Sequence, residues 1–458
     1  KVRCRMNYTG KKILVIGAGT SGIGAAHVLG KLGAQVVLND LKAIDLEPTT
    51  EAKLKDLGVS IITGRQDESL LEGIDMIVVS PGLPLTIPIL LAAKAAGIPV
   101  VGEVEVAYQV SKAPILGVTG TNGKTTTTTL LADVMKGTDF PVYVGGNIGD
   151  SLSEAAFAVP ENGVLVAELS SYQLESIHSF KAHGAIVLNL TPDHLARHKT
   201  MDGYRLAKEN IFKNQGPSDF VVLNLDDPIV AGMKDRATGK VLCISQKEVV
   251  TDGAYFAGTT CYAVKDGHAQ PIISKNQIPI PGAHNVENIL SVIALTYALG
   301  VGPDVIHDAI ANFKAVEHRL ERVDTIDGIT YYNDSKATNT DSVEKALASF
   351  DQKVILLMGG HDKMTPLNEF MKVVKDHTKE LILMGEAADR FEAAARDIGI
   401  ESIHRASSMG QAVNLGRELG QKGDVVLLSP ACSSFDWYSC FEERGCDFKR
   451  EVLRLKGE

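Results

Sequence analysis

Short apolar runs recur along the whole chain, and helical patterns lie between them. Most of the runs end in Gly, Ser, Asn or Asp. Ten of them cover residues 11–17, 34–40, 75–82, 113–120, 163–170, 184–194, 219–227, 353–360, 380–386 and 424–431. This alternation predicts parallel β-sheets covered by helices. Because ligands of open α/β sheets bind beyond the carboxyl ends of the strands, we expect functional residues to follow these runs.

The chain is too long for a single domain. It has 458 residues, whereas a single hydrophobic core stops growing at roughly 250–300 residues. The pattern separates three blocks, at residues 1–102, 103–316 and 317–458, without an internal repeat or a low-complexity tract. We therefore predict three domains with these boundaries.

Composition and charge narrow the class of function. With 45% hydrophobic and 22% charged residues, the chain has the composition of a globular protein. Its formal net charge of −10 opposes nucleic acid or a membrane surface as the main partner. No apolar stretch approaches the roughly 18 residues of a membrane span. We expect a cytoplasmic protein without membrane insertion, and no obligate protein partner is evident.

The cysteines fit the same compartment. They show no C-x-x-C spacing and are too sparse for a disulfide framework, which favours reduced thiols. They are Cys4, Cys243, Cys261, Cys432, Cys440 and Cys446.

A first glycine loop follows the first apolar run. Gly17, Gly19 and Gly22 form G-x-G-x-x-G ahead of a helical stretch, and Asp40 ends the next run. Taken alone, this pattern favours an NAD-linked oxidoreductase. It encodes only an anion site at a helix N-terminus, however, so the pyrophosphate of a UDP-sugar would also satisfy it.

A second loop is more specific for phosphate. The sequence from Gly120 to Thr125 reads GTNGKT and opens a Thr-rich helix. In such a loop backbone N–H groups surround the β- and γ-phosphates, Lys124 supplies positive charge and the Thr125 hydroxyl can reach Mg²⁺. Val118 stands where the full P-loop pattern has glycine. The loop predicts ATP binding, in an enzyme or, as an alternative, in a nucleotide-gated switch.

Candidate metal ligands give weaker signals. Glu168 ends a run and offers the oxygen ligands that Mg²⁺ prefers, and His194 follows Asp193 after another run. An Asp-His pair alone more often forms a turn than a ligand site. Lys208 lies four residues after Tyr204 on a helix expected over residues 202–212. By itself it is expected to be a solvated helix lysine.

Motifs in a fixed order carry a resemblance to a known family. The chain contains GTNGKTTTTTL, GGNIG, ELSSYQLE, TPDH, YRLAKENIF, GAHNVEN, EHRLE and DSKATN, and in these it resembles the Mur ligases over nearly its whole length. DSKATN, VVSPGLP and SPACSSFD are similar to the members that add D-glutamate. The resemblance implies an α/β fold with a Rossmann-like N-terminal domain for a UDP-substrate, a central P-loop-type ATPase domain with a mostly parallel sheet, and a Rossmann-like C-terminal domain for the amino acid.

The resemblance also implies roles for individual residues. ATP would bind at Gly120, Thr121, Asn122, Gly123, Lys124, Thr125, Thr126, Asn285, Asn288, Arg319 and Asp334. The UDP-substrate would bind at Thr20, Ser21, Asp40, Ser80, Gly82, Asn147 and Ser170, and D-glutamate at Thr338, Lys363, Ser434 and Phe441. Two Mg²⁺ ions would be held by Thr125, Glu168, His194 and Lys208, with a CO₂-derived carbamate on the lysine. The catalytic residues would be Lys124, Glu168, His194 and Lys208.

The implied reaction is an ATP-dependent ligation. The γ-phosphoryl group of ATP would pass to the carboxylate of UDP-N-acetylmuramoyl-L-alanine, and the amine of D-glutamate would attack the acyl-phosphate, giving ADP and phosphate in peptidoglycan precursor synthesis. Because water would destroy the acyl-phosphate, we expect domain closure, with hinges near residues 102–111 and 314–318. A sister ligase that adds a different amino acid or extends folate is a further alternative.

Overall fold

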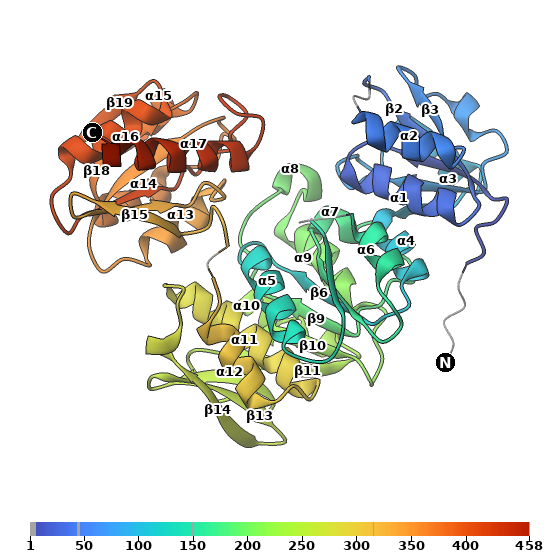
Figure 1. The fold of residues 1–458 in the computed structure, drawn as a ribbon, viewed down its shortest axis with the longest axis horizontal. Coiled ribbons are helices and arrows are strands. Elements are labelled where there is room, and N and C mark those ends of the chain that lie inside the picture. Colours follow the sequence, from blue (N-terminus) through green and yellow to red (C-terminus); the bar gives the residue numbers. More distant parts are fainter. Residues whose placement is uncertain (1–5, 44–45, 148–150, 315, 458) are drawn as a thin grey trace. The chain divides into compact units, whose positions relative to one another are not determined.

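The structure is a computed structural model that describes residues 6–43, 46–147, 151–314 and 316–457. The chain divides into two compact units: the first comprises the chain up to Ile278 with Val286–Asn312, and the second comprises Pro279–Asn285 with the chain from Phe313 onwards. The first unit contains two β-sheets and the second contains one (Figure 1). The predicted α/β fold with mostly parallel sheets is confirmed, whereas the boundaries at residues 102 and 316 remain a prediction.

The N-terminal sheet is a parallel, doubly wound sheet with the strand order β3-β2-β1-β4-β5. Along β1, Ile13 and Val15 enter one hydrophobic cluster, whereas Leu14 and Ile16 enter the cluster on the opposite face. Apolar residues on both faces explain the continuous hydrophobic run in the sequence. The elements are β1 (Lys12–Ile16), α1 (Thr20–Lys31), β2 (Gln35–Asp40), α2 (Pro48–Asp56), β3 (Ser60–Thr63), β4 (Met76–Val79), α3 (Pro88–Ala95) and β5 (Val100–Gly102).

The central sheet has the order β14-β13-β12-β11-β10-β9-β6-β8-β7 and is parallel from β7 to β12. Strands β12, β13 and β14 pair antiparallel at one edge. The strands are β6 (Ile115–Thr119), β7 (Val142–Gly146), β8 (Val164–Glu168), β9 (Gly184–Val187), β10 (Phe220–Asn224), β11 (Lys240–Ser245), β12 (Gly253–Ala257), β13 (Thr260–Lys265) and β14 (His268–Ser274).

Helices cover this central sheet. Helix α4, where we expected a hinge, packs against α6, and α5 packs against β8. The helix α5 forms although threonine has a low helix propensity, because its Leu130, Leu131 and Val134 are buried. The helices are α4 (Glu103–Val110), α5 (Lys124–Lys136), α6 (Leu152–Ala158), α7 (Ser171–Leu174), α8 (Leu195–His198), α9 (Met201–Glu209), α10 (Pro228–Ala231), α11 (Ala283–Ala298) and α12 (Pro303–Ala311).

The C-terminal sheet has the order β15-β16-β20-β17-β18-β19, and only the β15–β16 pair is antiparallel. Residues of β17 alternate between two hydrophobic clusters, one on each face. The elements are β15 (Glu321–Ile326), β16 (Ile329–Asn333), α13 (Thr340–Leu347), β17 (Val354–Gly359), α14 (Asn368–His377), β18 (Thr378–Met384), α15 (Ala388–Asp397), β19 (Ile403–Ala406), α16 (Met409–Leu419), β20 (Val425–Leu428) and α17 (Phe441–Arg454).

The ten apolar runs all contain strands, but some expected bounds were wrong. The helix expected over residues 202–212 spans Met201–Glu209 and continues as a 3₁₀ turn at Asn210–Phe212. Cys243, Cys261, Cys432, Cys440 and Cys446 are free, as predicted, whereas Cys4 lies outside the described residues. Among the helices that the structure describes, none combines the length and the apolar character needed to cross a bilayer.

Candidate active site

The GTNGKT loop connects β6 to the N-terminus of α5, so its N–H groups lie where anions bind to helices. Gly120 and Gly123 adopt φ angles of 149° and 85°. A Cβ atom at Gly123 would lie 2.3 Å from Asn288 Oδ1. The backbone N–H of Thr121 and that of Asn122 donate to Asn189, at 2.9 Å each. The loop therefore requires its glycines, and the neighbouring strand end holds its shape.

Lys124 bends back over this loop. Its Nζ donates to the carbonyl oxygens of Gly120 and Thr121, at 3.0 and 2.7 Å. The ammonium group therefore stays beside the phosphate loop, where it adds to the positive potential of the helix N-terminus. The loop residues that were predicted to bind phosphate, through Thr126, all lie in the loop or in the first turn of α5.

Glu168 ends β8 and pairs in register with Val118 of β6, directly before the phosphate loop. Its side chain is only 1% exposed. Oε1 accepts a hydrogen bond from Asn147 Nδ2 at 2.9 Å, whereas Oε2 has no hydrogen-bond partner. A buried carboxylate oxygen without a partner costs free energy, and a hard cation at this position would remove that cost.

The role predicted for Asn147 remains untested. Its side chain donates to Glu168, and its backbone N–H donates to Glu168 O at 2.9 Å. In this arrangement it orients the carboxylate, whereas the resemblance implies contact with the UDP-substrate. Ile148 and Gly149 of the same GGNIG motif lie outside the described residues.

Lys208 is not the solvated helix lysine that its local pattern predicted. It is 1% exposed, because α9 turns Tyr204, Ala207 and Lys208 toward the protein interior. Nζ donates to Gly120 O at 2.7 Å and lies 4.8 Å from the centre of the Tyr204 ring. Burial, and then the charge of Lys124, hold the pKa of Lys208 well below its ordinary value of 10.5. A neutral amine at this position can react with CO₂.

Tyr204 links three predicted site residues. Its hydroxyl lies 3.2 Å from Thr121 Oγ1, its ring lies under Lys208, and its ring centre is 6.3 Å from that of His194. The structure therefore gathers the phosphate loop, His194 and Lys208 around one aromatic ring. The charges of Asp193 and Glu168 also act on Lys208 and oppose the lowering of its pKa.

His194 precedes α8 with a left-handed backbone, at φ 54°. Its Nδ1 lies 3.0 Å from the hydroxyl of Tyr172, and its Nε2 lies 3.6 Å from Asp193 Oδ2. A positive φ is uncommon outside glycine and indicates a constrained position. Sequence analysis did not identify Tyr172 or Asn189, although both belong to or follow the recognised strand ends.

Five of the residues predicted to bind the UDP-substrate lie at or after the carboxyl ends of β1, β2 and β4, in the sheet whose strand order reverses between β1 and β4, whereas Asn147 and Ser170 belong to the central sheet. Ser80 Oγ donates to Gly17 O at 2.8 Å, and Asp40 Oδ2 accepts from Ala18 N at 2.9 Å. Thr20 and Ser21 open α1 beside them. The point where the strand order reverses is the usual ligand site of a doubly wound sheet. Gly82 follows Ser80 in the loop after β4, and Ser170 caps α7 in the central domain.

In the second unit the strand order reverses between the neighbouring strands β17 and β20. Lys363 follows β17 and Ser434 follows β20, and the two loops are paired through His361 and Ser433. Thr338 follows β16, and Phe441 opens α17 with its carbonyl bonded to Ser335 Oγ at 2.8 Å. The structure therefore brings together, within this unit, the loops predicted to bind D-glutamate.

Arg319 and Asp334 also belong to the second unit, as does Asn285, whereas Asn288 belongs to the first. Asp334 is buried; it accepts from Ser429 Oγ at 2.8 Å and from Leu320 N at 3.2 Å. Burial raises the pKa of Asp334 to about 7. These predicted ATP-binding roles remain predictions.

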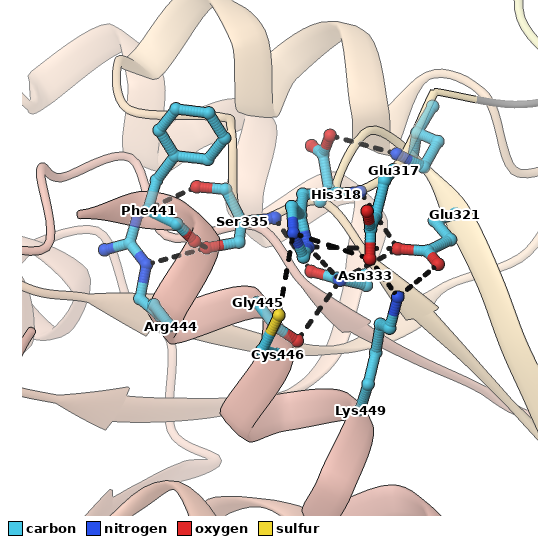
Figure 2. Close-up of polar contacts among 12 residues, drawn as sticks. Glu317, His318, Glu321, Asn333, Ser335, Phe441, Arg444, Gly445, Cys446 and Lys449 are labelled. Atoms are coloured by element: carbon cyan, nitrogen blue, oxygen red, sulfur yellow. Dashed lines mark hydrogen bonds and ion pairs between the residues drawn. The ribbon is translucent and has the colours of Figure 1, made fainter. Parts of the chain in front are cut away.

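A polar cluster holds the segment that carries Arg319 (Figure 2). Glu317, His318 and Cys446 could together present three metal-ligand atoms. However, Asn333 Nδ2 donates to His318 Nδ1 at 2.8 Å, so the neutral ring carries its proton on Nε2, the nitrogen that faces Cys446. A protonated Nε2 cannot bind a metal, and the cluster is therefore better suited to positioning the chain beside Arg319 than to holding an ion.

The fold and the phosphate loop define the class of protein as a P-loop-type α/β enzyme with three sheets. Three domain models match the chain: the MurD-like N-terminal domain of Mur ligases at residues 11–102, the Mur ligase middle domain at 118–296, and the glutamate ligase domain of Mur ligases at 318–432. The chain belongs to the Mur ligase family, as the resemblance of its motifs implied.

Curated relatives match over almost their entire length. A UDP-N-acetylmuramoylalanine--D-glutamate ligase of Pelotomaculum thermopropionicum is 43% identical, covering 98% of this chain and 99% of that protein. The ligase of the same name from Clostridioides difficile is 42% identical, with 98% and 100% coverage.

Solved structures share the fold. UDP-N-acetylmuramate-alanine ligase MurC of Thermotoga maritima superposes with a TM-score of 0.62 at 21% identity, over 97% of this chain and 99% of that one. MurF ligase of Thermotoga maritima, in complex with ADP, gives 0.60 at 16% identity, with 97% and 96% coverage.

Proposed function

We propose that this protein is an ATP-dependent ligase that joins D-glutamate to UDP-N-acetylmuramoyl-L-alanine through an acyl-phosphate. The proposal is carried by the full-length similarity, at 40–43% identity, to enzymes that bear the name of this ligase. We also propose that it acts in the cytoplasm, where ATP and the nucleotide-linked substrate are available.

The phosphate loop binds the ATP phosphates in this proposal. Backbone N–H groups at the start of α5, together with the ammonium group of Lys124, would bind the transferring γ-phosphoryl group, whereas the N–H groups of Thr121 and Asn122 hold the loop against Asn189. Phosphoryl transfer requires little covalent help from the protein, so fixed positive charge and in-line positioning provide most of the rate. Lys124 donates now to two loop carbonyls and would exchange these bonds for phosphate oxygens.

The residues around Glu168 fit the Mg²⁺ ions that the family implies. The partnerless, buried Oε2 of Glu168 offers a hard oxygen ligand, and Thr125 stands at the start of the adjacent helix. Bound Mg²⁺ would neutralise charge on the phosphate oxygens during transfer. His194, and Lys208 after carbamylation, would complete the ligand set.

Lys208 is suited to carbamylation because it is buried with a lowered pKa. A carbamate requires a neutral amine, and its product is an anion that supplies oxygen ligands. The nitrogen lone pair of the neutral Lys208 amine attacks the carbon of CO₂, one C=O π bond opens to place negative charge on oxygen, and one N–H proton is lost to water, so the amine becomes a carbamate anion. The positive charge of Lys124 has two effects in this proposal. It lowers the pKa of Lys208, which keeps the amine neutral, and it would stabilise the negative charge of the carbamate once that has formed.

The remaining substrates are proposed to bind where the strand order reverses in the N-terminal and C-terminal sheets. The UDP group would lie at the N-terminus of α1, between β1 and β4, with Asp40 and Ser80 at its edge. D-glutamate would lie between the β17 and β20 loops, where Lys363 can meet a carboxylate. Its neutral amine would attack the acyl-phosphate, and phosphate would leave.

One coupled assay tests this function. Phosphate release is measured with ATP, Mg²⁺ and UDP-N-acetylmuramoyl-L-alanine while the amino acid is varied among D-glutamate, L-glutamate, L-alanine and diamino acids. D-glutamate alone should stimulate release, and Lys124→Ala should reduce it by more than about tenfold, equal to ~1.4 kcal/mol of transition-state stabilisation. Stimulation by another amino acid would identify a sister ligase, and tight NADH binding without UDP-substrate binding would favour an oxidoreductase.

A further inference from the structure

Tyr172 lies directly beside His194, although no role follows for it from the motifs. It is the second residue of α7, a helix whose N-terminus is closed by a capping box between Ser170 and Gln173. The Tyr172 hydroxyl is 3.0 Å from His194 Nδ1, and the two ring centres are 4.8 Å apart. A short, capped helix therefore presents this hydroxyl to one particular ring nitrogen.

The hydrogen bond at His194 Nδ1 determines whether the other ring nitrogen, Nε2, can bind a metal ion. A neutral imidazole carries one proton, and it binds a metal through the nitrogen that lacks it. When the Tyr172 oxygen accepts a hydrogen bond from Nδ1–H, Nε2 keeps its lone pair. Histidines that bind metals generally have such a partner on the second nitrogen, which fixes both the tautomer and the orientation of the ring.

Surrounding contacts keep Tyr172 in place. The guanidinium carbon of Arg197 lies 5.2 Å from the centre of its ring, and Arg197 donates to Glu175 Oε2 at 2.8 Å. His198 Nε2 lies 2.9 Å from Ser171 Oγ and its Nδ1 lies 3.1 Å from Glu175 Oε1. These bonds join α7 to α8, so Tyr172 has a fixed position beside the exposed His194.

We propose that Tyr172 is a positioning residue of the ligase site, whose hydroxyl accepts a hydrogen bond from His194 Nδ1–H and thereby makes Nε2 the unprotonated nitrogen, whose lone pair can bind a divalent cation. The inference rests on the proposed function, because it assigns His194 to metal binding. Phenylalanine at this position would keep the ring contacts with His194 and Arg197 but would lose the oxygen.

The first experiment compares Tyr172→Phe with Tyr262→Phe. Tyr262 stacks on Tyr255 in the antiparallel edge of the central sheet, so its variant removes a tyrosine hydroxyl outside the proposed site. Removing a partner of a metal-binding histidine typically reduces metal affinity or activity about 10–100-fold. Tyr172→Phe should therefore need at least about tenfold more Mg²⁺ for half-maximal rate, while its melting temperature and its KM for the UDP-substrate stay near those of the unmodified enzyme.

Excess Mg²⁺ should restore part of the rate of Tyr172→Phe, which a purely structural defect would not allow. An unchanged Mg²⁺ dependence would overturn the inference. A raised KM for the UDP-substrate with normal Mg²⁺ dependence would also overturn it, because Tyr172 would then contact the substrate itself.

A second experiment does not depend on turnover. Imidazole ¹⁵N NMR of the full chain, without Mg²⁺ or substrates, reports the tautomer of each histidine, and a spectrum of His194→Gln assigns His194. The unmodified protein should show protonated Nδ1 at His194, and Tyr172→Phe should show a mixture of tautomers. Identical His194 shifts in both proteins would refute the hydrogen bond.

Binding of Mn²⁺, followed by electron paramagnetic resonance with ADP present, separates the two hypotheses. If the unmodified protein binds Mn²⁺ more tightly than Tyr172→Phe does but shows no D-glutamate-dependent phosphate release, the proposed function fails while the positioning role stands. If both proteins bind Mn²⁺ equally, the positioning role fails whatever the ligase assay gives.

Discussion

Replacing Arg444 by methionine should destabilise the second unit strongly. Arg444 is 2% exposed and donates four hydrogen bonds to two loops. The acceptors are Ser335 Oγ at 3.0 Å, Ser335 O at 2.8 Å, Cys432 O at 3.1 Å and Ser433 O at 3.2 Å. Methionine has a similar length and would remove these donors from the carbonyl oxygens of Ser335 and Cys432, whereas Ser433 O keeps the hydrogen bond from the backbone N–H of His361 at 2.9 Å.

The expected loss follows from these unpaired groups. Each buried acceptor left without a partner costs about 1–3 kcal/mol, whereas the loops can relax and recover part of that cost. Burial lowers the pKa of Arg444 to about 10, so the side chain is still charged at neutral pH. Replacing it by methionine removes the free-energy cost of burying that charge, and this gain offsets a further part of the loss from the unpaired acceptors. We expect a net loss of about 3 kcal/mol.

The assay uses the single tryptophan of the chain. Trp437 belongs to the second unit and is 38% exposed, so its fluorescence reports unfolding of that unit. With a denaturant dependence of about 2 kcal/mol per molar urea, Arg444→Met should lower the urea midpoint by about 1.5 M. The control is Arg454→Met in the same helix, whose side chain is 64% exposed, and which should shift stability by no more than about 0.5 kcal/mol.

The same variant has a functional consequence. The loops that Arg444 joins also carry Thr338 and Ser434, so the KM for D-glutamate should rise more than the KM for ATP. A urea midpoint within about 0.3 M of the unmodified protein would contradict the reasoning, since it would mean that the buried carbonyl groups find other partners at little cost.

Three further predictions concern single residues. Lys208→Met should abolish ligase activity yet raise the melting temperature measured without bicarbonate or Mg²⁺, because it removes a buried amine that opposes folding; a lower melting temperature would argue against this. Asp334 has a folded pKa of about 7 against an ordinary value of 3.8, so its contribution to stability should fall as pH rises between these values. Asp334→Asn should therefore gain stability relative to the unmodified protein between pH 5 and pH 8 in urea unfolding, and a constant difference would exclude the raised pKa. Lys363→Ala should raise the KM for D-glutamate about tenfold or more, since a hydrogen bond to a charged group contributes about 1.5–3 kcal/mol; unchanged D-glutamate dependence would assign that role elsewhere.

The sequence alone determined the fold class, the phosphate loop and the places where strands end. These features are local: apolar runs predict buried strands, and the glycines of residues 120–123 are needed by the turn that they form. The ten predicted runs leave out ten of the strands that the structure describes, among them β13 and the edge strand β14, where half-exposed hairpin strands lack a continuous apolar run. The order of motifs indicated the family, since many short motifs in sequence leave little room for coincidence.

Only the tertiary structure decided the state of the site residues. Lys208 has the local sequence of a surface lysine, yet the packing of α9 buries it beside Gly120, which is 88 residues away in the chain. The hydroxyl of Tyr172 reaches His194 because α7 and α8 are joined through Glu175. Burial and charge depend on which segments meet in space, and a linear pattern does not contain that information. The protonation of Lys208, the free oxygen of Glu168 and the orientation of His194 are therefore properties of the folded chain.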